Sequence, residues 1–249
     1  MNGFANDPNW VLDAGKDYPS LAWEGTPGGI IPEPEIDWLE GQGTADRPYR
    51  IDTADQLILL GKASILWDKH FVLGAYIDLD PNLPGRQVFT QAPIQSFTGV
   101  FDGNGRTISH LTIDGRDYLG LFGRLGWLAE VRNLGVVDVN ITGSGDYVGA
   151  LAGQSYGGVA QCYSSGSVSG RSEVGGLVGH NGYYCQVTNC WSNVSVSGHA
   201  WVGGLVGYNY YGAVTQCYST STVADTQYGS DGGLVGSNRD GTVTASFWD

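Results

Sequence analysis

The chain has 249 residues, of which 40 are glycine and 14 tyrosine, and its net charge is −13 with only 12 lysines and arginines. Such glycine enrichment beside many aromatic and β-branched residues predicts short strands joined by tight turns, and excludes disorder. A chain this acidic lacks the basic stripe that phosphate contacts require, which excludes nucleic acid as a partner. No apolar run reaches the length of a membrane span, so we expect no membrane insertion, and no signal peptide is present in this segment.

The N-terminal part of the sequence divides into three regions. Residues 1–30 carry aromatic anchors and end in the breaker TPGG, which predicts a tail-like docking segment. Residues 31–47 form an acidic linker, in which two prolines favour extended backbone. Residues 48–96 form a capping region that opens on a short strand. The start at Met1 followed by a loop-like stretch suggests that the chain is one segment of a longer protein.

One helix is expected, at about residues 54–68. Thr53 followed by Gln56 makes a capping box, and Leu57, Leu60 and Trp67 then recur at helical spacing. We expect this helix to cover the end of the array that follows, because an uncapped array would offer unpaired strand edges to other chains.

The capping region also contains a weak imitation of a calcium loop. Asp78, Asp80 and Asn82 alternate in the run DLDPN, but Leu83 stands where such a loop requires glycine. The alternative is a plain strand end with a proline turn. No other cofactor is indicated by the sequence.

From residue 97 to residue 249 the chain repeats itself. The run YVGALAG returns as EVGGLVG, WVGGLVG and SDGGLVG, and a short form, YLGLFG, precedes them. The repeated leucines lie 30, 26, 28 and 29 residues apart and are Leu121, Leu151, Leu177, Leu205 and Leu234. A period of this length is typical of repeat arrays, in which each unit buries its apolar face against its neighbours. We therefore predict an all-β parallel β-helix (β-solenoid) with coils of about 28 residues, joined at turns such as DGNG (102–105).

Two further residue types recur with the same period. Cys162, Cys190 and Cys217 lie 28 and 27 residues apart, which predicts an internal column of reduced thiols, with a disulfide or metal site as the alternative. Cys185 is out of this register. Three asparagines also recur, each two residues after its GLVG, and predict a hydrogen-bonded ladder along the axis. They are Asn181, Asn209 and Asn238.

The repeat resembles a known family. VGGLVG-x-N followed by V-T-x-C-Y-S is similar to the GLUG motif of bacterial cell-surface and secreted proteins, and FTGVFDGNGRTISHLTI looks like the segment that introduces GLUG arrays. The likeness covers roughly residues 44–249, while residues 9–24 resemble the tail that follows the closing SFWD of such arrays. The resemblance implies a β-solenoid with adhesive or structural roles and supplies no catalytic residues. It also implies an extracellular or cell-surface location.

Aromatic residues make the main candidate surface. Tyr163, Trp191 and Tyr218 each follow a column cysteine and should face outward, whereas Tyr184 and Tyr211 lie in the turns. Exposed aromatic rows can bind sugar rings or a protein partner; alternatively they stack on one another and shield the sheet.

These patterns predict a non-enzymatic structural or adhesive module. Its expected partners are copies of itself or adjacent repeat units, joined head to tail. The alternative is a carbohydrate-binding module that uses the aromatic rows on surface glycans. A polysaccharide-cleaving β-helix is the third reading, although no acids or histidines recur in register to support it.

Overall fold

The computed structural model describes residues 10–11, 20–21, 36–224 and 231–249. The chain forms two units, residues 1–38 and 39–249. Within its described residues, the first unit contains β1 (Trp10–Val11) and β2 (Ser20–Leu21), which pair antiparallel. The docking segment expected at residues 1–30 lies otherwise outside the described residues, as does the first part of the linker expected at residues 31–47.

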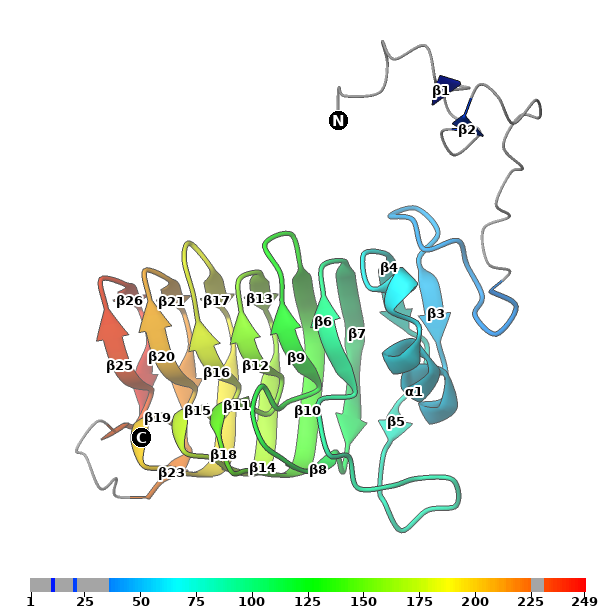
Figure 1. Cartoon of the computed structure of the whole chain (residues 1–249). Helices are drawn as coiled ribbons and strands as arrows, with labels where there is room; N and C mark the ends of the chain where they lie inside the picture. The colour runs from blue at the N-terminus through cyan, green and yellow to red at the C-terminus, as the bar shows by residue number, and fades with distance from the viewer. Residues whose placement is uncertain (1–9, 12–19, 22–35, 225–230) are drawn as a thin grey trace. The chain divides into compact units, whose positions relative to one another are not determined.

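The second unit is the parallel β-solenoid that the sequence predicts. Strands of successive coils pair in parallel and build three sheets of 15, 6 and 4 strands (Figure 1). The six-stranded sheet takes one strand from each coil, namely β6 (Ile94–Phe97), β9 (Phe122–Leu125), β12 (Ala152–Ser155), β16 (Val178–Asn181), β20 (Val206–Tyr210) and β25 (Val235–Arg239). The four-stranded sheet contains β11 (Asp146–Gly149), β15 (Ser172–Gly175), β19 (Ala200–Gly203) and β24 (Asp231–Gly232).

The largest sheet runs along the whole unit. Its earlier strands are β3 (Tyr49–Ile51), β4 (His70–Leu73), β5 (Ile77–Asp78), β7 (Val100–Ser109), β8 (Thr112–Gly115) and β10 (Glu130–Gly143). Its later strands are β13 (Gly158–Ala160), β14 (Tyr163–Ser169), β17 (Gln186–Thr188), β18 (Trp191–Ser197), β21 (Ala213–Thr215), β22 (Tyr218–Ser219), β23 (Thr222–Val223), β26 (Thr242–Thr244) and β27 (Phe247–Trp248). Strands β3, β4 and β5 therefore extend the solenoid sheet into the expected capping region.

The register between coils follows the sequence repeat. Strand β14 pairs with β18 without a shift, from Tyr163 opposite Trp191 to Ser169 opposite Ser197. The repeated leucines are all buried, Leu121 at 0% exposure and Leu234 at 4%. Because side chains alternate across a strand, an unshifted register places like residues on like faces and keeps one apolar set inside.

Left-handed backbone makes the corners of each coil. One column of corners precedes the GLVG-type strands and holds Tyr118, Tyr147, Glu173 and Trp201, with φ between 53° and 64°. Another precedes the cysteine column and holds Gln161, Asn189 and Gln216. The DGNG segment also has positive φ, at Asn104 and Gly105, but it lies inside β7 and shifts the register against β10. The positive φ expected for DGNG is therefore present, but it makes an irregularity within a paired strand and not a turn between strands.

The second glycine of GGLVG is required by close approach of the next coil. A Cβ at Gly176 would lie 2.1 Å from the carbonyl oxygen of Gly204 and 2.2 Å from Ser192 Oγ. A Cβ at Gly204 would meet Gly233 and Ser219 in the same way. These contacts are shorter than any side chain permits, so Gly176 and Gly204 are required where these coils touch, whereas Ala150 stands at the equivalent position of an earlier coil.

The single helix of the described residues is α1 (Ala54–Lys62), which packs against β3 and β6 near the first coil (Figure 1). Its capping box is present, since Thr53 Oγ1 accepts from the Gln56 amide and the Gln56 side chain accepts from the Thr53 amide. The helix ends earlier than the expected residue 68. Ala63 leaves helical geometry, a 3₁₀ turn η1 (Ser64–Leu66) follows, and the Trp67 indole N–H donates to the Leu60 carbonyl.

The three periodic cysteines stack inside the solenoid. The Cys162 amide lies 3.4 Å from Cys190 Sγ, and the Cys190 amide 3.4 Å from Cys217 Sγ. All three, and the out-of-register Cys185, are buried free thiols. Burial raises the pKa of Cys190, and it raises the pKa of Cys185 to about 12, so both thiols stay protonated and unreactive at neutral pH.

The asparagines form a hydrogen-bonded ladder. Asn181 Nδ2 donates to Asn209 Oδ1 at 2.8 Å, and Asn209 Nδ2 donates to Asn238 Oδ1 at 2.7 Å. Asn209 Nδ2 also bonds the Gly212 carbonyl. The ladder stops at Asn181, whose Oδ1 has no partner within the described residues, because Ser155 of the preceding coil turns its hydroxyl to Gly157.

The central rung of this ladder should contribute most to stability. Replacing Asn209 by alanine leaves the Asn181 side-chain amide without its ladder partner and removes the bond to Asn238, at a cost of about 2–4 kcal/mol. Asn238→Ala, at the exposed end, should cost about 1 kcal/mol. Urea unfolding followed by circular dichroism measures both, and equal losses would contradict the ladder.

Candidate functional site

An aromatic ladder covers the outer side of the largest sheet. Trp191 stacks on Tyr163 with ring centroids 4.7 Å apart and on Tyr218 at 6.0 Å, and Tyr218 stacks on Phe247 at 5.6 Å. The ring planes differ by 11° or less. The register of β14, β18, β22 and β27 puts the four residues opposite one another.

This stacking limits what the ladder can bind. The Tyr163 ring also lies over Gly135, where a Cβ would come within 2.4 Å of the ring. Both faces of Trp191 are therefore covered by neighbours, and a ligand reaches the ring edges. A sugar that stacks on an aromatic ring needs a free face. The geometry favours mutual shielding as the role of this ladder.

The turn tyrosines form a second group. Tyr183 stacks on Tyr211 at 4.7 Å and meets the edge of Tyr210 at 5.0 Å. Tyr184 tilts against Tyr183 and is 81% exposed. Of the two turn residues singled out from the sequence, Tyr211 is thus half covered by a neighbouring ring, whereas Tyr184 points largely into solvent.

A buried contact between Glu173 of β15 and His180 of β16 lies beneath further aromatic rings. His180 Nδ1 lies 2.5 Å from Glu173 Oε2, and each residue is 7% exposed. The rings of Tyr147, Tyr156 and Tyr208 surround His180 at 5.4–6.1 Å. Burial, with the nearby Glu173 charge, raises the pKa of Tyr147 to about 12, so this hydroxyl stays neutral.

The Glu173–His180 pair occupies two positions that interact in other coils as well. Each coil places one residue at the left-handed corner and another on the outer face of the following strand. In one coil Arg124 lies over the Tyr118 ring at 3.7 Å, and in another Trp201 stacks on Tyr208 at 5.1 Å. The register aligns Arg124, His180 and Tyr208 through Gln154. Sequence reasoning missed this column because its residue types change from coil to coil.

The side-chain oxygens of the predicted calcium loop, Asp78 and Asp80, accept hydrogen bonds from neighbouring protein groups. Asp78 Oδ1 accepts from the Asp80 amide and pairs with His110 Nδ1 at 2.8 Å, while Asp80 Oδ1 accepts from the Asn82 amide and side chain. Partial burial opposes ionisation of Asp78, yet the bonds from His110 and Asp80 hold its pKa below the usual value. These bonds are those of a structural turn, the alternative that the sequence left open.

Other acidic groups are also engaged in structural bonds. Asp102 accepts from Arg132 Nε at 2.9 Å and from Asn133 Nδ2 at 3.1 Å, and Arg132 also binds Glu130. Burial would raise the pKa of Asp102, but these bonds and the Asn104 amide lower it. Across the described ranges, no group of three or more His, Cys, Asp and Glu side chains is placed to hold a metal ion.

Comparison with known proteins gives a family motif. The model of the GLUG motif matches residues 170–199 and 202–224, which contain β15 to β23. The chain therefore carries GLUG repeats, as the sequence pattern indicated.

Two curated proteins are similar in sequence. Halomucin of Haloquadratum walsbyi is 38% identical over 148 residues, 56% of this chain and 2% of halomucin. A "Putative Gly-rich membrane protein" of Evansella cellulosilytica is 36% identical over 129 residues, 47% of this chain and 14% of that protein. The chain thus spans a small part of either relative. None of the described helices is long or apolar enough to cross a bilayer.

One solved structure shares the fold. The crystal structure of a "putative immunoglobulin A1 protease" from Bacteroides ovatus aligns with a TM-score of 0.59 at 20% identity, over 84% of this chain and 77% of the other. This likeness shows the solenoid architecture and carries no information on activity.

The outer aromatic ladder should act as a stabilising element. Trp191→Ala removes two stacked neighbours and should cost about 1–3 kcal/mol of unfolding free energy. Phe247→Ala removes one neighbour and should cost about half as much. Chemical unfolding of the two variants measures the difference, and an unchanged stability in Trp191→Ala would contradict a shielding role.

Proposed function

Because the chain carries GLUG motifs within a parallel β-solenoid, we propose that it is a non-enzymatic structural module of an extracellular surface protein. The module spaces and joins neighbouring units along the solenoid axis, and adhesion follows from this assembly. The observation that carries the proposal is the last described coil, where β26 and β27 end the largest sheet within the described residues and carry exposed apolar side chains.

The comparisons support a surface location. One relative is named halomucin, and the name of the other describes it as a Gly-rich membrane protein. Identities of 38% and 36% over about half of this chain support a common fold for the aligned segments. The acidic composition suits a soluble surface exposed to an extracellular medium.

The two ends of the solenoid differ in how far other parts of the chain cover their strand edges. At the first coils, α1 packs on β3 and β6, and the stretch around Glu40 bridges to Arg50. At the last coil, Val243, Phe247 and Trp248 are 41%, 61% and 66% exposed, on strands whose outer edges have no partner strand within the described residues. An edge with exposed apolar groups favours pairing with a strand of another unit.

The side chains also argue against an enzyme. The Glu173–His180 pair is buried, and aromatic rings enclose it. Asp78 and Asp102 are held by turn and strand hydrogen bonds. A catalytic acid or base must reach a substrate, and these groups are committed to the fold.

End-to-end association of the 249-residue chain tests the proposal. Sedimentation velocity over a ~100-fold concentration range should show a mass that rises with concentration. Phe247→Glu/Trp248→Glu should return the protein to a monomer, because charge at the last coil opposes strand pairing. Leu128→Glu is the control: this apolar residue between β9 and β10 is even more exposed, at 85%, and the variant should associate like the wild type. A concentration-independent monomer, or equal behaviour of both variants, would contradict this.

A further inference from the structure

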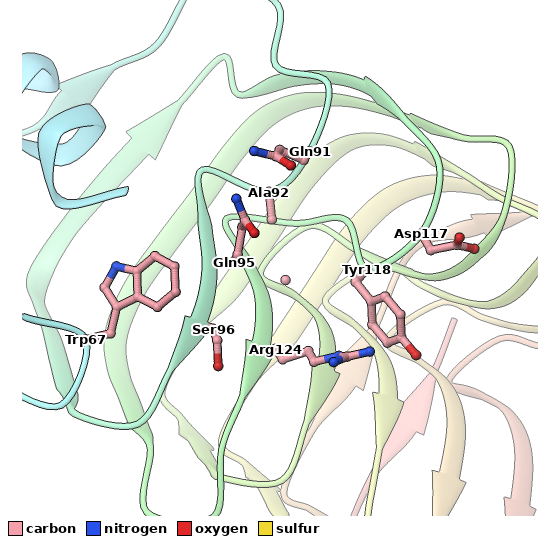
Figure 2. A pocket seen from close by; sticks show the side chains of 9 residues that line it. Trp67, Gln91, Ala92, Gln95, Ser96, Asp117, Tyr118 and Arg124 are labelled. Atoms are coloured by element: carbon pink, nitrogen blue, oxygen red, sulfur yellow. The ribbon is translucent and has the colours of Figure 1, made fainter. Parts of the chain in front are cut away.

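A hollow of about 340 Å³ opens where the cap meets the first GLUG-type coil, away from both aromatic groups described above. Figure 2 shows Trp67 on one side of it, Tyr118 and Arg124 on the other, and Gln95 between them. Gln91 and Asp117 complete the polar lining. We propose that this hollow binds one ring of a neutral saccharide, a ligand site that the structural role does not require.

The aromatic and charged walls of the hollow are held in place. The Trp67 indole N–H is fixed to the Leu60 carbonyl, and the Trp67 carbonyl accepts from the amides of Thr98 and Gly99 at 2.8 and 2.9 Å. Tyr118 is fixed at a left-handed corner and stacks on Tyr147 at 4.5 Å. A preformed wall reduces the ordering that binding requires, which favours affinity for a small ligand.

Asp117 and Arg124 are fixed as well. Asp117 Oδ1 accepts from the Asp146 amide at 2.8 Å, and Asp117 Oδ2 pairs with Arg116 at 3.2 Å. The Arg124 guanidinium lies over the Tyr118 ring and forms no ion pair with any described residue. Its N–H groups, which lie in the plane of the guanidinium, are therefore available to a ligand in the hollow.

The amides supply both donors and acceptors. Gln91 and Gln95 are exposed, and neither side chain has a hydrogen-bond partner in the part of the chain that the structure describes. Each amide offers a carbonyl oxygen and an NH2 group, Asp117 accepts and Arg124 donates. A sugar ring carries several hydroxyls that both donate and accept, and its C–H face packs on an indole, so the lining matches it.

Charge and size select among ligand classes. Arg124 and Asp117 carry opposite charges in the hollow, and the chain has a net charge of −13, which disfavours polyanions and phosphate. A single carboxylate is too few for a metal ion. A volume of about 340 Å³ lies at the low end for ligand sites and suits one ring. A second hollow of about 140 Å³ shares Gln91 and Gln95 and extends toward α1. This second hollow leaves room for a further ring of the saccharide.

The test begins with a glycan array probed with the labelled 249-residue chain, followed by calorimetry with the neutral oligosaccharide that gives the strongest signal. We expect a Kd between about 10 μM and 1 mM, the range for a ligand of one or two rings. Gln95→Ala and Arg124→Ala should each weaken binding about 10-fold.

Two control variants isolate the hollow. Arg239→Ala removes a guanidinium that also lies over a tyrosine, Tyr210, at 5.7 Å, and Gln186→Ala removes an exposed glutamine of β17. Both should bind as the wild type does. The proposal is overturned if no neutral saccharide binds at about 10 mM, if the Gln95 and Arg124 variants bind unchanged while melting normally, or if only anionic polysaccharides bind. Any of these results leaves the sedimentation behaviour, and with it the structural function, untouched.

Discussion

The structure depends on one constraint: the backbone of each coil bonds to the backbone of the next in a parallel register that places equivalent residues opposite each other, with shifts in the pairings of β10. The Leu177 amide donates to the Leu205 carbonyl at 2.9 Å, and the Leu205 amide donates to the Leu234 carbonyl at the same distance. Such bonds leave no freedom for one coil to slide on another, because a slip of one residue would turn the leucine column outward. Every column of side chains in the molecule is a consequence of this register.

Inner and outer columns respond to this constraint differently. Inside, each position must hold a side chain that tolerates a copy of itself one coil away. Leucine meets this requirement by apolar packing and cysteine by weak sulfur contacts. Asparagine meets it by hydrogen bonds between side-chain amides. On the outer face, unlike residues of one coil meet, because the residue at its left-handed corner contacts the residue on its following strand, as in the Glu173–His180 pair and in Arg124 over Tyr118. The stacked interior thus stabilises the fold and leaves the outer columns free to differ.

Much of this fold could be predicted from the sequence because the interior repeats. The period of the leucines, the stacking of the cysteines and the capping box at Thr53 all follow from residue types at fixed spacing. The end of α1 could not, since it depends on a contact between the Trp67 indole and the Leu60 carbonyl. The residue types of DGNG predict its positive φ values, but they do not show that these values make an irregularity within β7.

The candidate sites also differ in whether their residues repeat at a fixed spacing in the sequence. The outward aromatic row was visible as a column, and its stacking geometry indicates how far each ring face is covered. The hollow lined by Trp67, Gln95 and Arg124 was not visible, because these residues belong to different coils and share no spacing. Arg124 alone carried a signal: it stands in register with Gln154 and His180, so a polar column on this face could have been noticed.

The most direct test of the register uses cysteine pairs on β14 and β18. Ser167 and Ser195 are opposite each other, so Ser167→Cys/Ser195→Cys should oxidise to a disulfide in the folded protein. Ser167→Cys/Asn193→Cys is offset by two residues, which separates the Cα atoms by about 8 Å and prevents the bond. Mass spectrometry after mild oxidation reports the crosslink. A disulfide in the first pair alone is the expected result, whereas crosslinking of the offset pair, or of neither, would contradict the stacked register.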